Sequence, residues 1–232
     1  SQFLHKSNNK GASWKIISTD LTTNDSAKID QRDNGGLSID ITGAENHCTI
    51  ICIAPSAVQK DLIYIGTDDG KVQVTSNGGA TWTDLTANII GLPKGAWIPQ
   101  IRTSSFNANE AFVVANNYRQ GDFAPYIFRT TDGGKTWTNI VDAKKVNGYA
   151  LTVLQDPVEP NLIFAGTEQG FYVSLDNGAS FQQWKNGYPS VSTYDFAIQD
   201  READLAIATF GRSLWVLDDI RPLRKLAATK GE

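Results

Sequence analysis

The sequence has no methionine, two cysteines and two histidines, and no apolar run of the roughly 18 residues that a membrane-spanning helix needs. It starts at Ser1 without the apolar core of a signal peptide, as a mature, processed or excerpted chain would. The net charge is −4, and acidic and basic residues are mixed along the whole chain. Because a nucleic-acid surface would show a basic stripe, we expect no nucleic-acid partner.

The scarce cysteines and histidines also argue against disulfides and metals. Cys48 and Cys52 would lie about 13 Å apart in a strand, whereas a disulfide requires Cα atoms within about 7 Å. We therefore expect two reduced, buried thiols. His47 stands beside Cys48, but a tetrahedral zinc site needs four ligands. Asp68-Asp69-Gly70 resembles a fragment of a calcium loop without the other ligands, so we expect a turn there. The sequence predicts no metal site and no cofactor.

No segment before the C-terminus shows a sustained helical period, and the short apolar runs rich in Ile and Val indicate an all-β protein. Four segments share the pattern Ser/Thr-x-Asp/Asn-x-Gly-x-Ser/Thr-aromatic and align without gaps. We call them the box turns: SNNKGASW (7–14), TSNGGATW (75–82), TTDGGKTW (130–137) and SLDNGASF (174–181). Each is followed by a strand-like run, which predicts a hairpin closed by a box turn.

The box residues are expected to be structural. The Asp or Asn side chain can accept hydrogen bonds from backbone N–H groups of its own loop. The glycine supplies a backbone conformation that other residues avoid, and the aromatic side chain packs over the turn. These residues are, in chain order, Asn9, Gly11 and Trp14; Asn77, Gly79 and Trp82; Asp132, Gly134 and Trp137; and Asp176, Gly178 and Phe181.

The repeat extends beyond the turns. Residues 53–75 and 154–174 match element by element, and 97–134 is a looser copy with an insertion before 124. Each unit therefore holds four strands, A to D, with the box turn between C and D. We expect strands at 49–54, 62–66, 71–75 and 81–85; at 98–103, 111–115, 126–130 and 136–140; and at 149–155, 162–166, 171–174 and 180–184. The B strands are apolar on both faces, as in sheets packed face to face around a propeller axis.

The chain begins and ends partway through one of these four-stranded units. It opens with a C–D hairpin and closes with A, B and C strands at 194–199, 204–209 and 213–218, so it holds about four blades. Incomplete blades expose sheet edges. We expect the C-terminal part of a larger β-propeller, with the remaining blades supplied by another chain or by an upstream segment. A small closed ring whose ends meet is the alternative. Residues 1–221 would form the blades, with a polar surface insertion at about 20–46, and 222–232 a C-terminal tail or linker.

The segments GTDDGKVQVTSNGGATW, DFAPYIFRTTDGGKTW, GTEQGFYVSLDNGASF and ATFGRSLWVLDDIRPL carry a family resemblance. The chain resembles the C-terminal half of the propeller in large bacterial proteins of the sortilin/Vps10-like BNR (Asp-box) repeat group, which are described as glycosyl hydrolases. Relatives of the last segment commonly read HGR where this chain has Phe210. The resemblance implies a secreted, periplasmic or surface-attached protein, and it implies no proven activity, because fold does not fix function.

Two kinds of glycan hydrolase can be weighed. A sialidase would need an arginine cluster, but no spacing singles out three among Arg102, Arg119, Arg129, Arg201 and Arg212. A two-carboxylate glycosidase needs acids about 5–9.5 Å apart. The weak catalytic candidates are Asp195, inside the A strand TYDFAIQ, and Asp122, in the insertion of the third repeat.

Loop aromatics motivate a binding function: Trp97, Tyr118, Phe123 and Tyr126. The candidate ligand-binding residues are Tyr118, Asp122, Tyr126 and Arg212. We expect an extracytoplasmic binding or scaffold module within a larger protein or assembly, with a glycan or protein ligand. The alternatives are a glycoside hydrolase that acts on a polysaccharide, with catalytic acids shared with the missing blades, and a purely structural piece.

Overall fold

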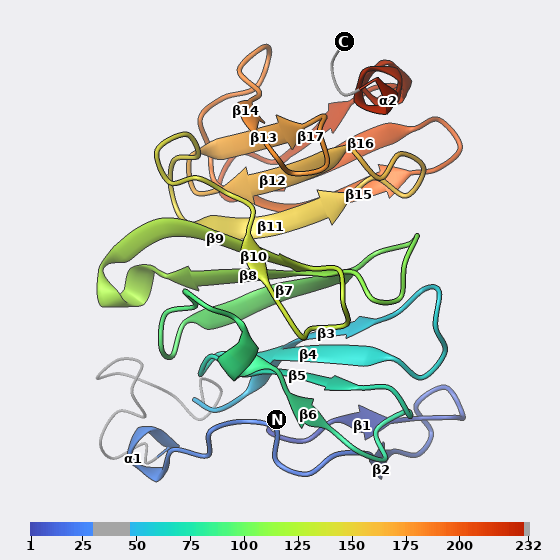
Figure 1. The fold of residues 1–232 in the computed structure, drawn as a ribbon, viewed down its shortest axis with the longest axis vertical. Coiled ribbons are helices and arrows are strands. Elements are labelled where there is room, and N and C mark those ends of the chain that lie inside the picture. Colours follow the sequence, from blue (N-terminus) through green and yellow to red (C-terminus); the bar gives the residue numbers. More distant parts are fainter. Residues whose placement is uncertain (30–46, 230–232) are drawn as a thin grey trace.

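The structure, a computed structural model, describes residues 1–29 and 47–229. It consists of antiparallel sheets that follow one another along the long axis of the molecule (Figure 1). The first is the hairpin of β1 (His5–Lys6) and β2 (Lys15–Ile16). The strands of the others, in chain order, are β3 (Ile50–Pro55), β4 (Ile63–Thr67), β5 (Val72–Thr75) and β6 (Thr83–Asp84); β7 (Trp97–Thr103), β8 (Ala111–Asn117), β9 (Asp122–Thr130) and β10 (Thr138–Asn139); β11 (Ala150–Gln155), β12 (Ile163–Thr167), β13 (Gly170–Ser174) and β14 (Gln182–Gln183); and β15 (Thr193–Gln199), β16 (Asp204–Thr209) and β17 (Leu214–Leu217).

Each whole blade is a meander of strands A to D in chain order, and the last sheet holds strands A to C. The A strands β3, β7, β11 and β15 pack against one another from blade to blade. Because the sheets of the three whole blades are covered by neighbours, their B strands β4, β8 and β12 are buried along nearly all of their length, and every residue of β12 is buried. The B strand of the last sheet, β16, is only partly buried. The all-β propeller segment is confirmed, including the half blade, three whole blades and three final strands expected from the repeat.

The sheet ends do not meet. The β1–β2 hairpin lies at one end of the long axis and the β15–β17 sheet at the other (Figure 1), so the described chain forms an open arc rather than a small closed ring. No helix among residues 1–29 and 47–229 is long and apolar enough to cross a membrane.

Strand boundaries differ from expectation in two places. The D strands are short, as in β6, because the residues after each box glycine are still held in the turn. In the third repeat, the insertion lengthens the B–C hairpin: β8 runs to Asn117, β9 starts at Asp122, and the 3₁₀ turn η3 (Tyr118–Gln120) joins them. This hairpin extends beyond the neighbouring turns (Figure 1).

In the box turns, the Asp or Asn side chain accepts from a backbone N–H of its own loop, with one chemical distinction between the two residues. In the third box, Asp132 accepts from the Thr136 N–H (3.0 Å) and from the Thr136 hydroxyl (2.7 Å). In the second, Asn77 accepts from the Thr81 N–H (2.9 Å) but donates its own amide to the Thr81 hydroxyl (2.8 Å). The threonine hydroxyl donates to Asp132 in the third box and accepts from Asn77 in the second, so both Asn and Asp can close the turn.

Box glycines also sit against the preceding blade. A Cβ on Gly134 would lie 2.5 Å from Leu85 Cδ1, and the backbone there has φ +89°. A Cβ on Gly79 would lie 2.4 Å from the Ile17 carbonyl oxygen. Glycine is therefore required twice over, for the left-handed conformation and for the close approach of blades.

Two segments outside the blades are partly described. The expected surface insertion at about 20–46 contains the short helix α1 (Ser26–Ile29), and its residues 30–46 lie outside the described residues. The expected tail at 222–232 is mostly the helix α2 (Arg221–Ala228), which packs on the third whole blade through an Arg224–Asp156 ion pair of 2.9 Å. Residues 230–232 of this tail lie outside the described residues.

Candidate functional site

The strand register gathers the loops at one end of the blades. Trp97 pairs with Asn116, Ala150 with Thr167, and Thr193 with Thr209, so each A strand starts where its B strand ends. The B–C turns and the connections into β7, β11 and β15 therefore share one face, which we call the B–C face. The box turns and the A–B turns lie at the opposite end. Any site built from several blades' B–C loops belongs to the B–C face.

Aromatic side chains meet on this face. Tyr118 stacks on Tyr149 with ring centroids 4.4 Å apart, and Phe123 lies 6.3 Å from Tyr149. The Arg119 guanidinium lies 3.4 Å above the Trp97 ring and 4.4 Å from that of Tyr118. These contacts join the second whole blade to the connection that enters the third, and cation–π attraction orders the cluster.

The last blade adds two further rings. Tyr194, at the start of β15, lies 5.7 Å from Phe210, in the β16–β17 turn. Phe210 is 72% exposed, Phe123 56% and Tyr194 48%. We call these side chains the aromatic band: Trp97, Tyr118, Phe123, Tyr149, Tyr194 and Phe210. Exposed rings that are held by contacts with one another are available to a ligand at little entropic cost.

The surroundings of Tyr149, in the aromatic band, favour the neutral form of its phenol, which can donate a hydrogen bond. Burial, followed by the negative charge of Glu168, raises the pKa of Tyr149. Its phenol therefore stays protonated at neutral pH and can donate to a ligand oxygen. Arg119 is exposed beside it and supplies further donors.

A cavity of about 660 Å³ opens on the same face at the first whole blade. Its walls come from the β4–β5 turn, the connection into β7, the α1 segment and the β8–β9 hairpin. Its polar and charged lining residues are Thr23, Asp25, Lys28, Asp69, Lys71, Thr86, Lys94 and Gln120. The B–C face thus carries a polar cavity at one blade and aromatic rings at the next three, of which Phe123, Tyr194 and Phe210 are exposed.

The catalytic candidate Asp122 closes the long hairpin. Its carboxylate accepts from the Tyr126 hydroxyl (2.9 Å), the Ala124 N–H (3.1 Å) and the Asn117 amide (3.4 Å). Although burial alone would raise its pKa, these hydrogen bonds hold it below its ordinary value. Tyr126 also stacks on Phe128, so both residues are engaged within the hairpin and outside the aromatic band.

The other candidate, Asp195, lies on the innermost strands. Its carboxylate pairs with Arg102 (2.8 Å) and accepts from the Gln100 amide (3.0 Å), both on β7, and lies 3.4 Å from the Thr152 hydroxyl on β11. It ties three blades together. Among the described residues, Asp122 and Asp195 share none of these partners, so these hydrogen bonds do not bring the two carboxylates together.

The arginines do not form a cluster. Arg102 pairs with Asp195, Arg129 with Glu110, and Arg201 with its neighbour Glu202. Arg212 is exposed in the β16–β17 turn on the B–C face, where its backbone carbonyl accepts from Trp215. Of the predicted ligand residues, the structure places Tyr118 in the aromatic band and Arg212 on the same face.

Comparison with known proteins supports the β-propeller fold and finds relatives that are named as xyloglucanases. No family model matches the chain. It is 25% identical over 160 residues to the oligoxyloglucan-reducing end-specific xyloglucanase of Emericella nidulans, and 26% identical over 173 residues to the xyloglucanase Xgh74A of Acetivibrio thermocellus. These matches cover 63% and 69% of this chain but 18% and 20% of the relatives, so the chain spans about a fifth of their length.

A solved structure agrees with this fold. The GH74 enzyme of Niastella koreensis matches 94% of this chain and 33% of its own at 14% identity, with a TM-score of 0.64. The comparisons support the glycosyl-hydrolase-like β-propeller part of the resemblance seen in the sequence. They do not support its sortilin/Vps10 part. The chain is therefore a β-propeller segment with xyloglucanases among its homologues.

Proposed function

We propose that the B–C face of this propeller segment binds a polysaccharide chain outside the cytoplasm, as part of a larger protein, with xyloglucan as the first ligand to test. The aromatic band carries the proposal. Its exposed and half-buried rings span three blades and lie beside a polar cavity on the same face. Xyloglucan is chosen because both curated relatives are named for it.

The chemistry of the band suits sugars. A pyranose ring has apolar C–H faces and a rim of hydroxyl groups, so it needs flat apolar area with polar groups at the edge. Tyrosine and tryptophan provide an apolar body with a polar tip. The Tyr118–Tyr149 stack with Arg119 beside it offers both kinds of contact within one cluster.

A glycoside hydrolase is the second candidate, favoured by the names of the two relatives. Asp195 could serve it only by changing partners, because Arg102 and Gln100 hold its carboxylate. In this version, other blades would supply the second acid. Release of reducing ends from xyloglucan by the full-length protein, and its loss in Asp195→Asn, would favour hydrolysis, whereas unchanged turnover in that variant would exclude Asp195 as the acid.

Binding is tested by affinity electrophoresis in gels that contain xyloglucan. We expect retardation of the wild type, and Tyr118→Ala and Phe210→Ala each to weaken binding by tenfold or more, as is typical for central aromatic contacts. Phe106→Ala is the matched control, because Phe106 is 44% exposed but lies in an A–B turn at the opposite end of the blade that bears Tyr118. Equal loss in all three variants, or no retardation of the wild type by xyloglucan, would overturn the proposal.

A further inference from the structure

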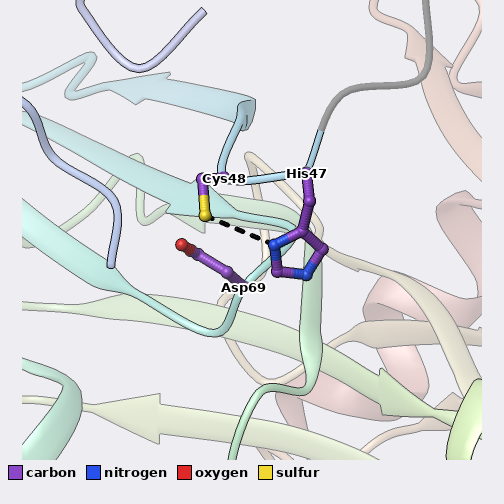
Figure 2. Close-up of side chains that lie close together, drawn as sticks. All are labelled: His47, Cys48 and Asp69. Carbon is purple, nitrogen blue, oxygen red and sulfur yellow. Dashed lines mark hydrogen bonds between the residues drawn. The ribbon is translucent and has the colours of Figure 1, made fainter. Parts of the chain in front are cut away.

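Beside the cavity, three side chains with metal-ligand atoms converge (Figure 2). His47 Nδ1 lies 3.3 Å from Cys48 Sγ, and the Asp69 carboxylate completes a group whose ligand atoms all lie within 4.8 Å of one another. All three side chains are buried. In the sequence Asp69 stands far from the His-Cys pair, but the pairing of Ile50 with Thr67 brings the β4–β5 turn beside the start of β3.

The backbone at Cys48 makes this convergence possible. Neighbouring residues in a strand point to opposite faces, whereas His47 and Cys48 point to the same place (Figure 2). Cys48 has φ +60°, in the left-handed region that residues with side chains seldom adopt. Such strained positions persist only where the surrounding structure imposes them, and they gather at functional sites.

Asp69 is already oriented as a ligand would be. One carboxylate oxygen accepts from both the N–H and the hydroxyl of Thr23, each at 2.7 Å, and the other accepts from the Thr67 hydroxyl. A carboxylate has about four acceptor positions, so one remains, and the Cys48 thiol lies against it. Hydrogen bonds of this kind fix ligand carboxylates around protein-bound metals.

We propose that His47, Cys48 and Asp69 form a three-ligand zinc site on the B–C face. The donor set is one sulfur, one nitrogen and one oxygen, all of which bind zinc in proteins. In a tetrahedral site with bonds of about 2.0–2.3 Å, ligand atoms lie about 3.5 Å apart, close to the observed Nδ1–Sγ separation. A thiolate and a carboxylate balance the charge of Zn²⁺. Three protein ligands leave a fourth position for water, and Asp69 lines the cavity from which water enters. The sequence-based expectation of no metal did not include Asp69 as a ligand.

Zinc binding is tested on the reduced, metal-free chain. Calorimetric titration with Zn²⁺ should give one site per chain and release of about one proton, because the thiol must ionise to bind. Titration with Co²⁺ should give visible bands of tetrahedral Co²⁺ and a near-ultraviolet thiolate-to-cobalt band. Cys48→Ser should abolish the thiolate band, and His47→Gln and Asp69→Asn should each weaken Zn²⁺ binding at least tenfold.

Cys52→Ser is the matched control, because Cys52 is the other thiol of the chain and lies against the Ile98 carbonyl instead (3.2 Å). It should bind both metals as the wild type does, and circular dichroism should show every variant folded. The proposal is overturned if the wild type gives no thiolate-to-cobalt band, or if Cys48→Ser keeps it. These measurements use no polysaccharide, so their outcome tests the zinc site independently of the proposed polysaccharide binding.

Discussion

At the scale of residues, the box turns show how a short pattern fixes a local structure. The Thr136 N–H and hydroxyl, together with other loop hydrogen bonds, lower the pKa of Asp132 from 3.8 to about 2. Because this pKa is lower in the folded protein than in the unfolded chain, the charged form stabilises the fold. That stabilisation is present above about pH 4 and is lost as the pH falls through about 2.

Asp132→Asn should therefore lower the melting temperature slightly at neutral pH, and the difference from wild type should disappear near pH 2. Asn77 shows that an amide can close the same turn. Melting curves across this pH range check the prediction, and Asn77→Asp should introduce the same pH dependence into the second box. A difference that grows as the pH falls would contradict this account.

Gly134 tests the contact between blades at a single Cβ. Gly134→Ala should cost about 1 kcal/mol for the left-handed backbone and roughly 1–3 kcal/mol more for the clash with Leu85. Gly91→Ala is the control, because Gly91 has the same φ of +89° and nothing within 4 Å of the added Cβ. Urea unfolding of both variants measures the difference, and equal costs would show that the clash is relieved without strain.

At the scale of elements, helix α2 is held to the third whole blade by a buried ion pair. Asp156 is fully buried, and Arg224 is 14% exposed. Arg224→Ala would leave the carboxylate without its cation, so we expect a loss of about 2–4 kcal/mol in urea unfolding. Arg221→Ala on the same helix is the control, because its pair with Asp219 is exposed and should contribute little to stability. Similar losses in the two variants would contradict the role of the buried pair.

The elements also show what the sequence could predict. Box turns, strand order and the incomplete blades follow from local spacing, so they were predictable. The β8–β9 hairpin was longer than expected, because the insertion pairs Asn117 with Asp122 instead of looping out. Asp122 and Tyr126 were singled out because they stand in or beside the insertion of the third repeat, and the structure engages them with each other within that hairpin.

The aromatic band was only partly visible in the sequence. Trp97, Tyr118 and Phe123 were singled out as binding aromatics, but Tyr149, Tyr194 and Phe210 were not, since their approach depends on how the blades pack. A signal was present: an aromatic residue stands within one residue of the start of β7, β11 and β15. The approach of His47, Cys48 and Asp69 to one another was not visible for a related reason, because it depends on the left-handed backbone at Cys48 and on the pairing of β3 with β4, which cannot be read from spacing.

At the scale of the whole molecule, apolar side chains are exposed on the last sheet. Leu214 and Val216 of β17 are 70% and 58% exposed, and they alternate along one face. We propose that further propeller blades, from another chain or from another part of the same protein, cover this face. In isolation, the chain should then self-associate through it.

Sedimentation velocity at several concentrations tests this, with Leu214→Lys combined with Val216→Lys. The double variant should sediment as a monomer where the wild type associates, and its stability should change by no more than about 0.5 kcal/mol, because both side chains are exposed. A wild type that remains monomeric at every concentration would contradict the proposal.

Hydrogen–deuterium exchange with and without a xyloglucan oligosaccharide tests the central claim most directly, because it locates the ligand on the folded chain. We predict slower exchange in the β8–β9 hairpin around Tyr118, at the entry to β11 around Tyr149 and in the β16–β17 turn around Phe210. The box turns and A–B turns should be unchanged. Slower exchange confined to that opposite end, or none at any B–C turn at saturating ligand, would contradict polysaccharide binding by the B–C face.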